Sequence, residues 1–311
     1  MGNNQKAASE FLEMKKISEW KSGSEMKYLA DNAGGGGRSP SPVQLTMAQA
    51  RAMGLNGSNG EPITPDELKK LNGLLRKHGI TDKKSAAAFF ANSQYETGNW
   101  TIDIENHGKG PGYGSLQLTG PEAKEDFYEL EIKNGYVKSA PTELIEAAKR
   151  AKAKYDDNRT DANKEAWIKA ENKINEQMKR DDLYWESGIY AWTGDKSKTK
   201  VGSINDYYNA GLAKNDDNMF YMSAIWIKGT SDTKTGNNLT KEEMESLRDN
   251  PYKAQVAVSG TVKDSSNKEY AATPNENILV IQDPATGRKS IFHMGNLTQR
   301  KDNYDKILGI L

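Results

Sequence analysis

The stretch from Ser85 to Thr119 places the strongest constraint on the fold. It opens with SAAAFFANSQYETG, a run of small and aromatic residues that favours a helix packed in a core. Phe89 and Phe90 lie on one face of this helix, and the same spacing reaches Glu96 in the last turn, just before Gly98. The sequence therefore predicts a carboxylate on the core-facing side of a helix end.

Local signals predict further helices on both sides of this stretch. Thr64-Pro65-Asp66-Glu67 combines an N-cap, a first-turn proline and the glutamate of a capping box. The next helix should begin near Lys83, with Asp82 or Thr81 as its N-cap. From 121 to 192 the pattern is again helical and highly charged, with a long excursion at about 140–180. A mainly α fold follows from these signals.

In the last third of the chain, the spacing of apolar residues changes from a helical to a strand-like pattern. Valines and isoleucines flank turn signals, notably Asp283 to Gly287, which predicts a small β-rich insertion at about 230–294 before a final helix with Tyr304. Residues 1–40 are interpreted as an N-terminal helical arm that ends in a Gly/Ser/Pro linker. The predicted architecture is α+β and mainly α, with one domain over 41–311 that carries two insertions.

Composition excludes several classes of site. The net charge is zero, with 43 basic and 43 acidic residues, so no global field favours nucleic acid or anionic lipid. There is no cysteine to ligate zinc, and the three histidines lie far apart in the sequence, so we expect neither metal nor cofactor. The sequence shows neither an apolar leader nor an apolar run long enough to cross a membrane, so we expect no membrane insertion. We expect the protein to be made in a bacterial cytoplasm without a signal peptide.

Two glutamates in unlike surroundings carry the functional prediction. Glu96, at the helix end, is expected to be desolvated and protonated, although pairing with a nearby Lys or Arg is the alternative. Residues 100–105 alternate as a short strand would and end on Glu105, which is expected to be wetter and ionised. The glycines at 108, 110, 112 and 114 are interpreted as allowing close approach of a ligand. A neutral acid with an ionised base is the minimal apparatus for glycosidic bond hydrolysis.

The surrounding residues resemble the family 19 glycoside hydrolases, the chitinases and phage endolysins of the lysozyme-like superfamily. The matching residues are Glu96-Thr97-Gly98, then Glu105, then Gly112-Tyr113-Gly114-Ser115-Leu116-Gln117-Leu118-Thr119. The resemblance covers about 64–120 and resumes at 295–308. It implies a lysozyme-like helical catalytic domain and inverting cleavage of a β-1,4-linked N-acetylglucosamine polymer, with Glu96 as general acid and Glu105 as general base.

The resemblance also implies roles for other residues. Thr119 matches the hydroxyl residue that positions the water, Gln117 matches a sugar-contacting amide, and Tyr113 belongs to the same motif. Arg300 matches an arginine near the base. Either Asn205 or Asn296 supplies a later asparagine of the cleft. Two positions depart from the pattern, because Tyr95 replaces a histidine before the acid and Pro121 to Lys124 replace an Asn-Tyr pair; Tyr95 is still expected to contact substrate.

Peptidoglycan is the expected substrate, and chitin is the alternative. A cysteine-free chain without a signal peptide resembles an endolysin or a delivered antibacterial effector, which acts at the cell wall after holin release or delivery by a secretion system. An immunity or delivery protein is then an expected partner. A different class remains open, namely a non-catalytic glycan-binding or structural component of a phage tail or secretion apparatus.

Overall fold

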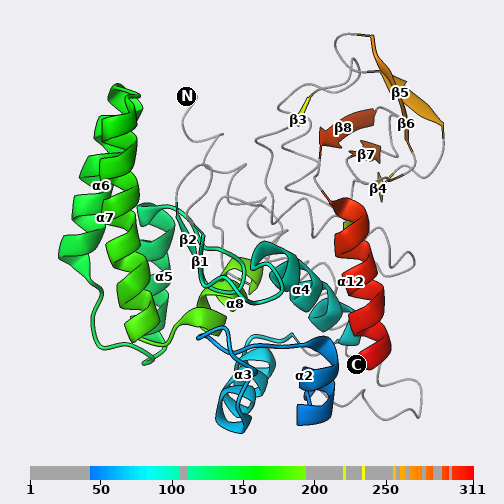
Figure 1. Ribbon diagram of the computed structural model, residues 1–311, viewed down its shortest axis with the longest axis horizontal. Coiled ribbons are helices and arrows are strands. Elements are labelled where there is room, and N and C mark those ends of the chain that lie inside the picture. Colours follow the sequence, from blue (N-terminus) through cyan, green and yellow to red (C-terminus); the bar gives the residue numbers. More distant parts are fainter. Residues whose placement is uncertain are drawn as a thin grey trace, which may run out of the picture.

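The computed structural model describes residues 43–80, 82–105, 111–193, 220–221, 233–234, 255–256, 260–263, 267–272, 274, 278–282, 289–293 and 296–311. Over these ranges the chain is mainly helical, as predicted (Figure 1). The helices are α2 (Met47–Met53), α3 (Pro65–Lys77), α4 (Lys83–Glu96), α5 (Pro121–Lys133), α6 (Thr142–Asp157), α7 (Asp161–Arg180), α8 (Tyr184–Thr193) and α12 (Leu297–Ile310). The arm and linker predicted over 1–40 lie outside the described residues. Within those ranges, no helix has an apolar stretch of the length a bilayer crossing requires.

The predicted helix starts are confirmed by their caps. The Glu67 backbone N–H donates to Thr64 Oγ1 at 3.3 Å, and Glu67 Oε2 accepts from the Thr64 backbone N–H at 2.9 Å. The Asp82 side chain accepts from two backbone N–H groups of the first turn of α4. Each cap satisfies donors that have no partner inside the helix, which explains why these starts can be predicted locally.

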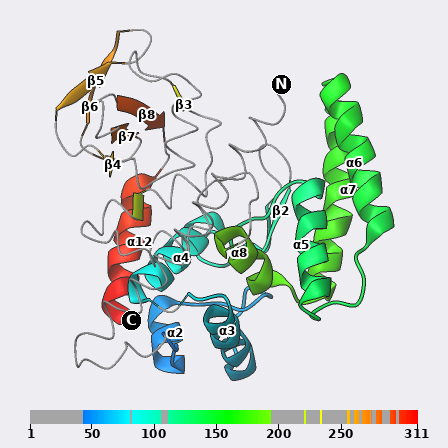
Figure 2. The ribbon, with the colours of Figure 1, turned by 180° about the vertical axis from the view of Figure 1, so that it is seen from behind.

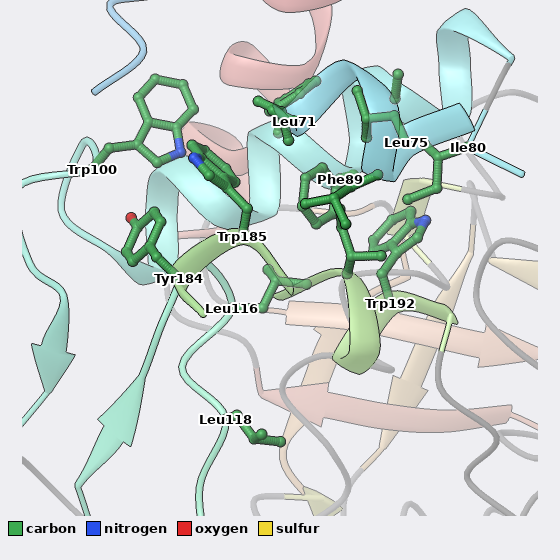
Figure 3. Packing of buried hydrophobic residues seen from close by; sticks show 14 of the residues in the cluster. Leu71, Leu75, Ile80, Phe89, Trp100, Leu116, Leu118, Tyr184, Trp185 and Trp192 are labelled. Atoms are coloured by element: carbon green, nitrogen blue, oxygen red, sulfur yellow. The ribbon is translucent and has the colours of Figure 1, made fainter. Parts of the chain in front are cut away.

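The core lies where α4 meets α8 and α12. Phe89 is fully buried, and its ring packs edge-on against Trp192 with centroids 5.8 Å apart. Phe90 packs in the same manner against Trp185, with centroids 6.3 Å apart. Figure 3 shows Phe89, Trp185 and Trp192 together in this core. The red helix α12 runs beside α4 in both views, so the final helix closes this core (Figures 1 and 2). The aromatic face predicted for α4 packs in the core, but it is not the only packed face, because every residue from Ser85 to Ser93 is buried.

The charged excursion is a pair of helices, α6 and α7, that lie side by side at one edge of the molecule (Figure 1). The chain turns between them at Asn158, the C-cap of α6. Tyr155 and Trp167 stack across the pair, with centroids 5.5 Å apart. Helix α5 packs against both helices, and it connects the pair to the rest of the molecule.

All described strand pairs are antiparallel. Ile104–Glu105 (β1) pairs with Gly112–Tyr113 (β2), and the predicted strand over 100–105 is thus limited to its last two residues, because the chain turns at Trp100. In its described residues, the β-rich segment forms two sheets. One has the order β3 (Thr233–Lys234), β8 (Lys289–His293), β7 (Ile278–Gln282), β4 (Gln255–Val256), and the other joins β5 (Thr261–Lys263) to β6 (Glu269–Ala271).

Candidate active site

Glu96 and Arg300 form an ion pair where the end of α4 meets the first turn of α12. Arg300 Nη2 lies 2.5 Å from Glu96 Oε1. The arginine side chain is 4% exposed and the glutamate side chain 21% exposed, so the pair is shielded on the arginine side and reaches solvent on the carboxylate side. This pairing is the alternative that the sequence left open for Glu96. Arg300 therefore contacts Glu96, and its expected place near Glu105 stays a prediction, because the Glu105 side chain lies outside the described residues.

Two further contacts fix the guanidinium of Arg300. Its Nη1 donates to Asn92 Oδ1 at 3.0 Å, and Asn92 is itself held by a bond from its Nδ2 to the Ala88 carbonyl at 2.9 Å. The guanidinium carbon lies 3.8 Å from the centre of the Tyr95 ring, a cation–π stack. Arginine presents several donors in a rigid plane, so these contacts fix its orientation as well as its charge.

Asn296 links the start of α12 to Tyr95 of α4 by a hydrogen bond. It is the N-cap of α12 with a left-handed backbone (φ 55°), and its Nδ2 donates to the Tyr95 hydroxyl at 2.7 Å. Of the residues predicted to contact substrate, Arg300 therefore contacts Glu96 directly, while Tyr95 contacts Arg300 and Asn296 contacts Tyr95. Asn205, the other candidate asparagine, lies outside the described residues.

A left-handed turn leads from Glu96 toward Glu105. Gly98, Asn99 and Trp100 have φ values of 54°, 62° and 59°. Such a conformation costs about 1–3 kcal/mol at a non-glycine residue and persists only where the surroundings impose it. Trp100 supplies that constraint, because its ring is buried and its Nε1 donates to Ser93 Oγ at 2.9 Å.

Glu105 follows this turn as the second residue of β1. Its backbone is opposite Gly112 in the β1–β2 pair. The side chain of Glu105, together with the segment 106–110, lies outside the described part of the chain. The structure therefore places the backbone of the predicted base, while its role remains a prediction.

Gly114, in the motif 112–119, is required by the close approach of α8. Gly114 has φ 83°, and a Cβ there would overlap Ser187 Oγ and lie 2.8 Å from the Tyr184 carbonyl oxygen. A Cβ on Gly188 would likewise overlap Ser115 Oγ. The Ser115 backbone N–H donates to the Tyr184 carbonyl at 3.2 Å. Two of the glycine positions thus permit close approach of loop and helix, which corrects the expectation that Gly114 serves a ligand.

The other motif residues divide into interior and surface positions. Tyr113 is fully buried, and burial raises the pKa of its hydroxyl well above the usual range. Gln117 Nε2 donates to the carbonyls of Gly114 (3.1 Å) and Ile102 (3.4 Å), so this side chain braces its own loop. Thr119 is exposed. Of these three predicted site residues, only Thr119 faces solvent.

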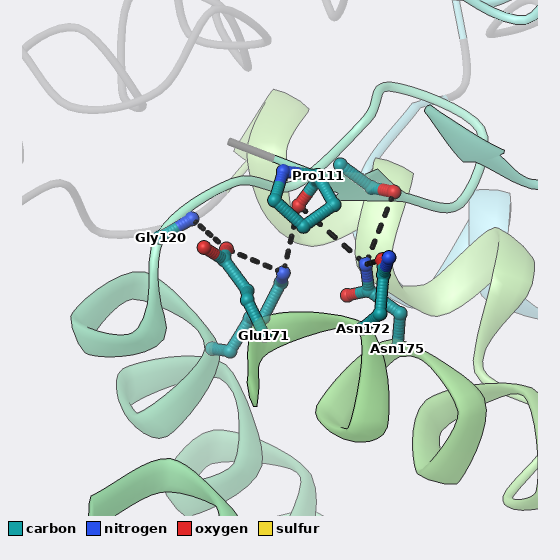
Figure 4. A network of polar contacts seen from close by, with 7 residues as sticks. Pro111, Gly120, Glu171, Asn172 and Asn175 are labelled. Carbon is teal, nitrogen blue, oxygen red and sulfur yellow. Dashed lines mark hydrogen bonds and ion pairs between the residues drawn. The ribbon is translucent and has the colours of Figure 1, made fainter. Parts of the chain in front are cut away.

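Sequence reasoning missed a buried ion pair next to this loop. Lys124 Nζ lies 2.7 Å from Glu171 Oε1, and both side chains are 0% exposed. Lys124 also donates to the Pro111 carbonyl at 3.0 Å, and Glu171 Oε1 accepts the Gly120 backbone N–H at 2.6 Å (Figure 4). Burial lowers the pKa of Lys124 to about 8, although Glu171 opposes the shift. Both residues are in segments that look solvated in the sequence, and no local signal marks them.

Two further buried carboxylates, Glu131 of α5 and Glu186 of α8, influence each other. Burial raises the pKa of Glu131 to about 7, with a further contribution from Glu186. Burial also raises the pKa of Glu186, while Lys70, 2.9 Å away, opposes that shift. Across the described ranges, no cluster of three or more His, Cys, Asp or Glu side chains is arranged to hold a metal ion.

Comparison with known proteins gave no match: no family model, no curated protein and no solved structure is similar to this chain.

Proposed function

We propose that the protein is a peptidoglycan hydrolase that cleaves β-1,4 glycosidic bonds with inversion. The observation that carries the proposal is the contact of Arg300 with Glu96, between segments about two hundred residues apart. The Tyr95 ring stacks on the same guanidinium, and Asn296 donates to the Tyr95 hydroxyl. Packing of the core does not require an aromatic hydroxyl, an amide and a carboxylate close together at a partly exposed helix end. Those groups are the ones that recognise and cleave a sugar.

In the proposed reaction Glu96 is the general acid. Arg300 contacts its Oε1, so we assign the proton transfer to Oε2. A proton passes from Oε2 to the glycosidic oxygen as the bond from the anomeric carbon to that oxygen breaks. Glu105 takes a proton from the attacking water on the opposite face of the ring, and the hydroxyl of Thr119 orients that water. An inverting site of this kind needs about 6.5–9.5 Å between the two carboxyl groups to admit the water.

Purified peptidoglycan tests the proposal directly. We expect the wild-type protein to release new reducing ends, which mass spectrometry of the products assigns to N-acetylglucosamine or N-acetylmuramic acid. Glu96→Gln should lower the rate by at least about a hundredfold, since general acid catalysis contributes about 10²–10⁴-fold. Glu143→Gln, at an exposed position on α6, is the matched control and should keep full activity.

Chitin is the second possible substrate, because the same two carboxylates would cut either polymer. Release of reducing ends from chitin but not from peptidoglycan would transfer the assignment to chitinase. Proton NMR of the first products reports the stereochemistry, and an inverting enzyme gives the α-anomer from a β-linkage. Initial formation of the β-anomer would contradict the inverting mechanism.

A non-catalytic glycan-binding protein is the other candidate, and the Glu96–Arg300 ion pair favours it. A carboxylate bonded to a buried guanidinium can be structural alone, and the interior positions of Tyr113 and Gln117 reduce the number of groups facing a ligand. Wild-type protein that binds peptidoglycan in a sedimentation assay and releases no reducing ends from either polymer would establish this candidate in place of the hydrolase.

A further inference from the structure

The buried pair Lys124–Glu171 holds both ends of the motif loop 111–120. Lys124 donates to the carbonyl of Pro111, the first residue of the loop, and Glu171 accepts the N–H of Gly120, the last residue (Figure 4). Asn175 lies one helical turn after Glu171, and its Nδ2 adds longer contacts to the carbonyls of Pro111 (3.5 Å) and Gly112 (3.4 Å). One ion pair therefore bonds to the backbone at the two points where the loop starts and ends.

These two points adjoin the proposed catalytic groups. Pro111 precedes β2, in which Gly112 is the register partner of Glu105. Gly120 follows Thr119 directly. The charged groups therefore reach the backbone opposite the proposed base and next to the proposed water-orienting hydroxyl, while Glu96 is held separately by α12.

Stability alone is a poor explanation for this pair. Taking a lysine and a glutamate out of water costs several kcal/mol per ion, and apolar residues of similar volume often give equal or greater stability. Glu171 Oε2 is buried and has no hydrogen-bond partner among the described residues, so the site is also incompletely satisfied. What an apolar pair cannot do is bond to a backbone carbonyl and a backbone N–H at defined positions.

We propose that Lys124 and Glu171 are positioning residues that clamp the two ends of loop 111–120 and so set the geometry of Glu105 and Thr119. This inference rests on the proposed function. The charged neighbours of the pair come from α5, α6 and α7: Lys124 and Glu171 face each other directly, and Lys152 on α6 is near enough for the charge of Glu171 to affect it.

Paired variants separate positioning from folding. Lys124→Met alone leaves Glu171 buried without its partner, and it should lower the thermal midpoint strongly. The double variant Lys124→Met/Glu171→Met removes both charges and should recover most of the midpoint. The double variant Lys124→Met/Glu171→Gln is its matched control, because a glutamine oxygen still accepts the Gly120 N–H while the contact to Pro111 is lost in both.

Three measurements are made on each protein: the thermal midpoint, amide hydrogen exchange of segment 111–120 with helix α3 as reference, and kcat and KM on peptidoglycan. We expect the Met/Met variant to recover its midpoint, to exchange faster in 111–120 but not in α3, and to lose kcat by on the order of ten- to a hundredfold at nearly unchanged KM. The Met/Gln variant should regain part of that kcat.

A Met/Met variant with wild-type kcat, or with wild-type exchange in 111–120, would overturn the clamp. Wild-type protein that releases no reducing ends from peptidoglycan or chitin would instead remove the proposed function. In that case the exchange measurement still decides whether the pair holds the loop, since it does not depend on activity.

Discussion

Arg300 and Glu96 lie 204 residues apart in the chain and meet through a 2.5 Å contact between a buried guanidinium and a partly exposed carboxylate. The carboxylate belongs to the last residue of α4, and the guanidinium is fixed by Asn92 and Tyr95 of the same helix. Helix α12 is therefore joined to the end of α4 by charge, by hydrogen bonding and by stacking at once.

A double-mutant cycle should detect this pair in the free energy of unfolding. Arg300→Met is expected to cost about 2–4 kcal/mol, because it leaves Glu96 and Asn92 without their buried donor. Combined with Glu96→Gln, the cycle should give a coupling energy of about 1–3 kcal/mol by urea denaturation. The exposed i,i+4 pair Lys152–Asp156 on α6 is the control, with a coupling below about 0.5 kcal/mol. Equal coupling in both pairs would contradict the arrangement.

Glu131 should make stability depend on pH. Its pKa is raised from an ordinary value of 4.5 to about 7 in the folded protein, so between these values the folded state binds more protons than the unfolded chain. The unfolding free energy should therefore fall as pH rises through this window, by at most about 1.4 kcal/mol per pH unit.

Urea unfolding of the wild type and Glu131→Gln at pH 5 and pH 7.5 measures this difference. The Gln variant should lose less stability over the interval, whereas Glu129→Gln, exposed on the same helix, should follow the wild type. A slope unchanged by Glu131→Gln would show that this carboxyl ionises in the folded state as it does in the unfolded chain.

Alanine at Gly114 should destabilise the protein by several kcal/mol. The residue has a positive φ, and the new Cβ would overlap Ser187 Oγ and approach the Tyr184 carbonyl, so both strain and steric overlap act against it. Gly73 in α3 is the matched control, since a Cβ there meets nothing within 4 Å. Gly73→Ala should raise stability by about 0.5–1 kcal/mol through helix propensity. Similar thermal midpoints for the two variants would contradict the close packing of the loop on α8.

Replacing Asn99 with glycine should relieve strain in the left-handed turn. Glycine adopts φ near 62° without steric cost, so we expect a gain of about 0.5–1 kcal/mol in unfolding free energy. Asn158, which has an extended φ of −142°, is the control, and Asn158→Gly should be neutral or destabilising. If Asn99→Gly lowers the thermal midpoint as much as Asn158→Gly does, the turn stores no strain at this residue.

Local chemistry explains which parts of the fold were predictable. Thr64 and Asp82 mark helix starts because a cap needs only the next three residues, and Glu96 was placed at the end of α4 because Gly98 follows within two residues. The charged helices α6 and α7 were predicted for the same reason, since their pattern and the turn at Asn158 are both short-range features.

The remaining features depend on contacts between distant segments. Lys124 belongs to a run of charged residues, so its sequence context predicts a solvent-exposed side chain. It is buried against Glu171 only because α5 packs on α7. The sequence suggests that Gly114 leaves space for a ligand. Only the position of α8 shows that Ser187 occupies this space. The contact of Arg300 with Glu96 likewise depends on the packing of α12 on α4.

The placement of Asn296 and Arg300 on α12 also sets an order for assembly during synthesis. Chains fold from the N-terminus as they leave the ribosome, so α4 emerges long before the helix that completes its end. Until α12 has emerged and packed, Glu96 has no guanidinium partner and Tyr95 has no bond from Asn296. A nascent chain therefore carries an unfinished cluster while the residues between α4 and α12 are made, and the site becomes complete only after α12 has packed on α4.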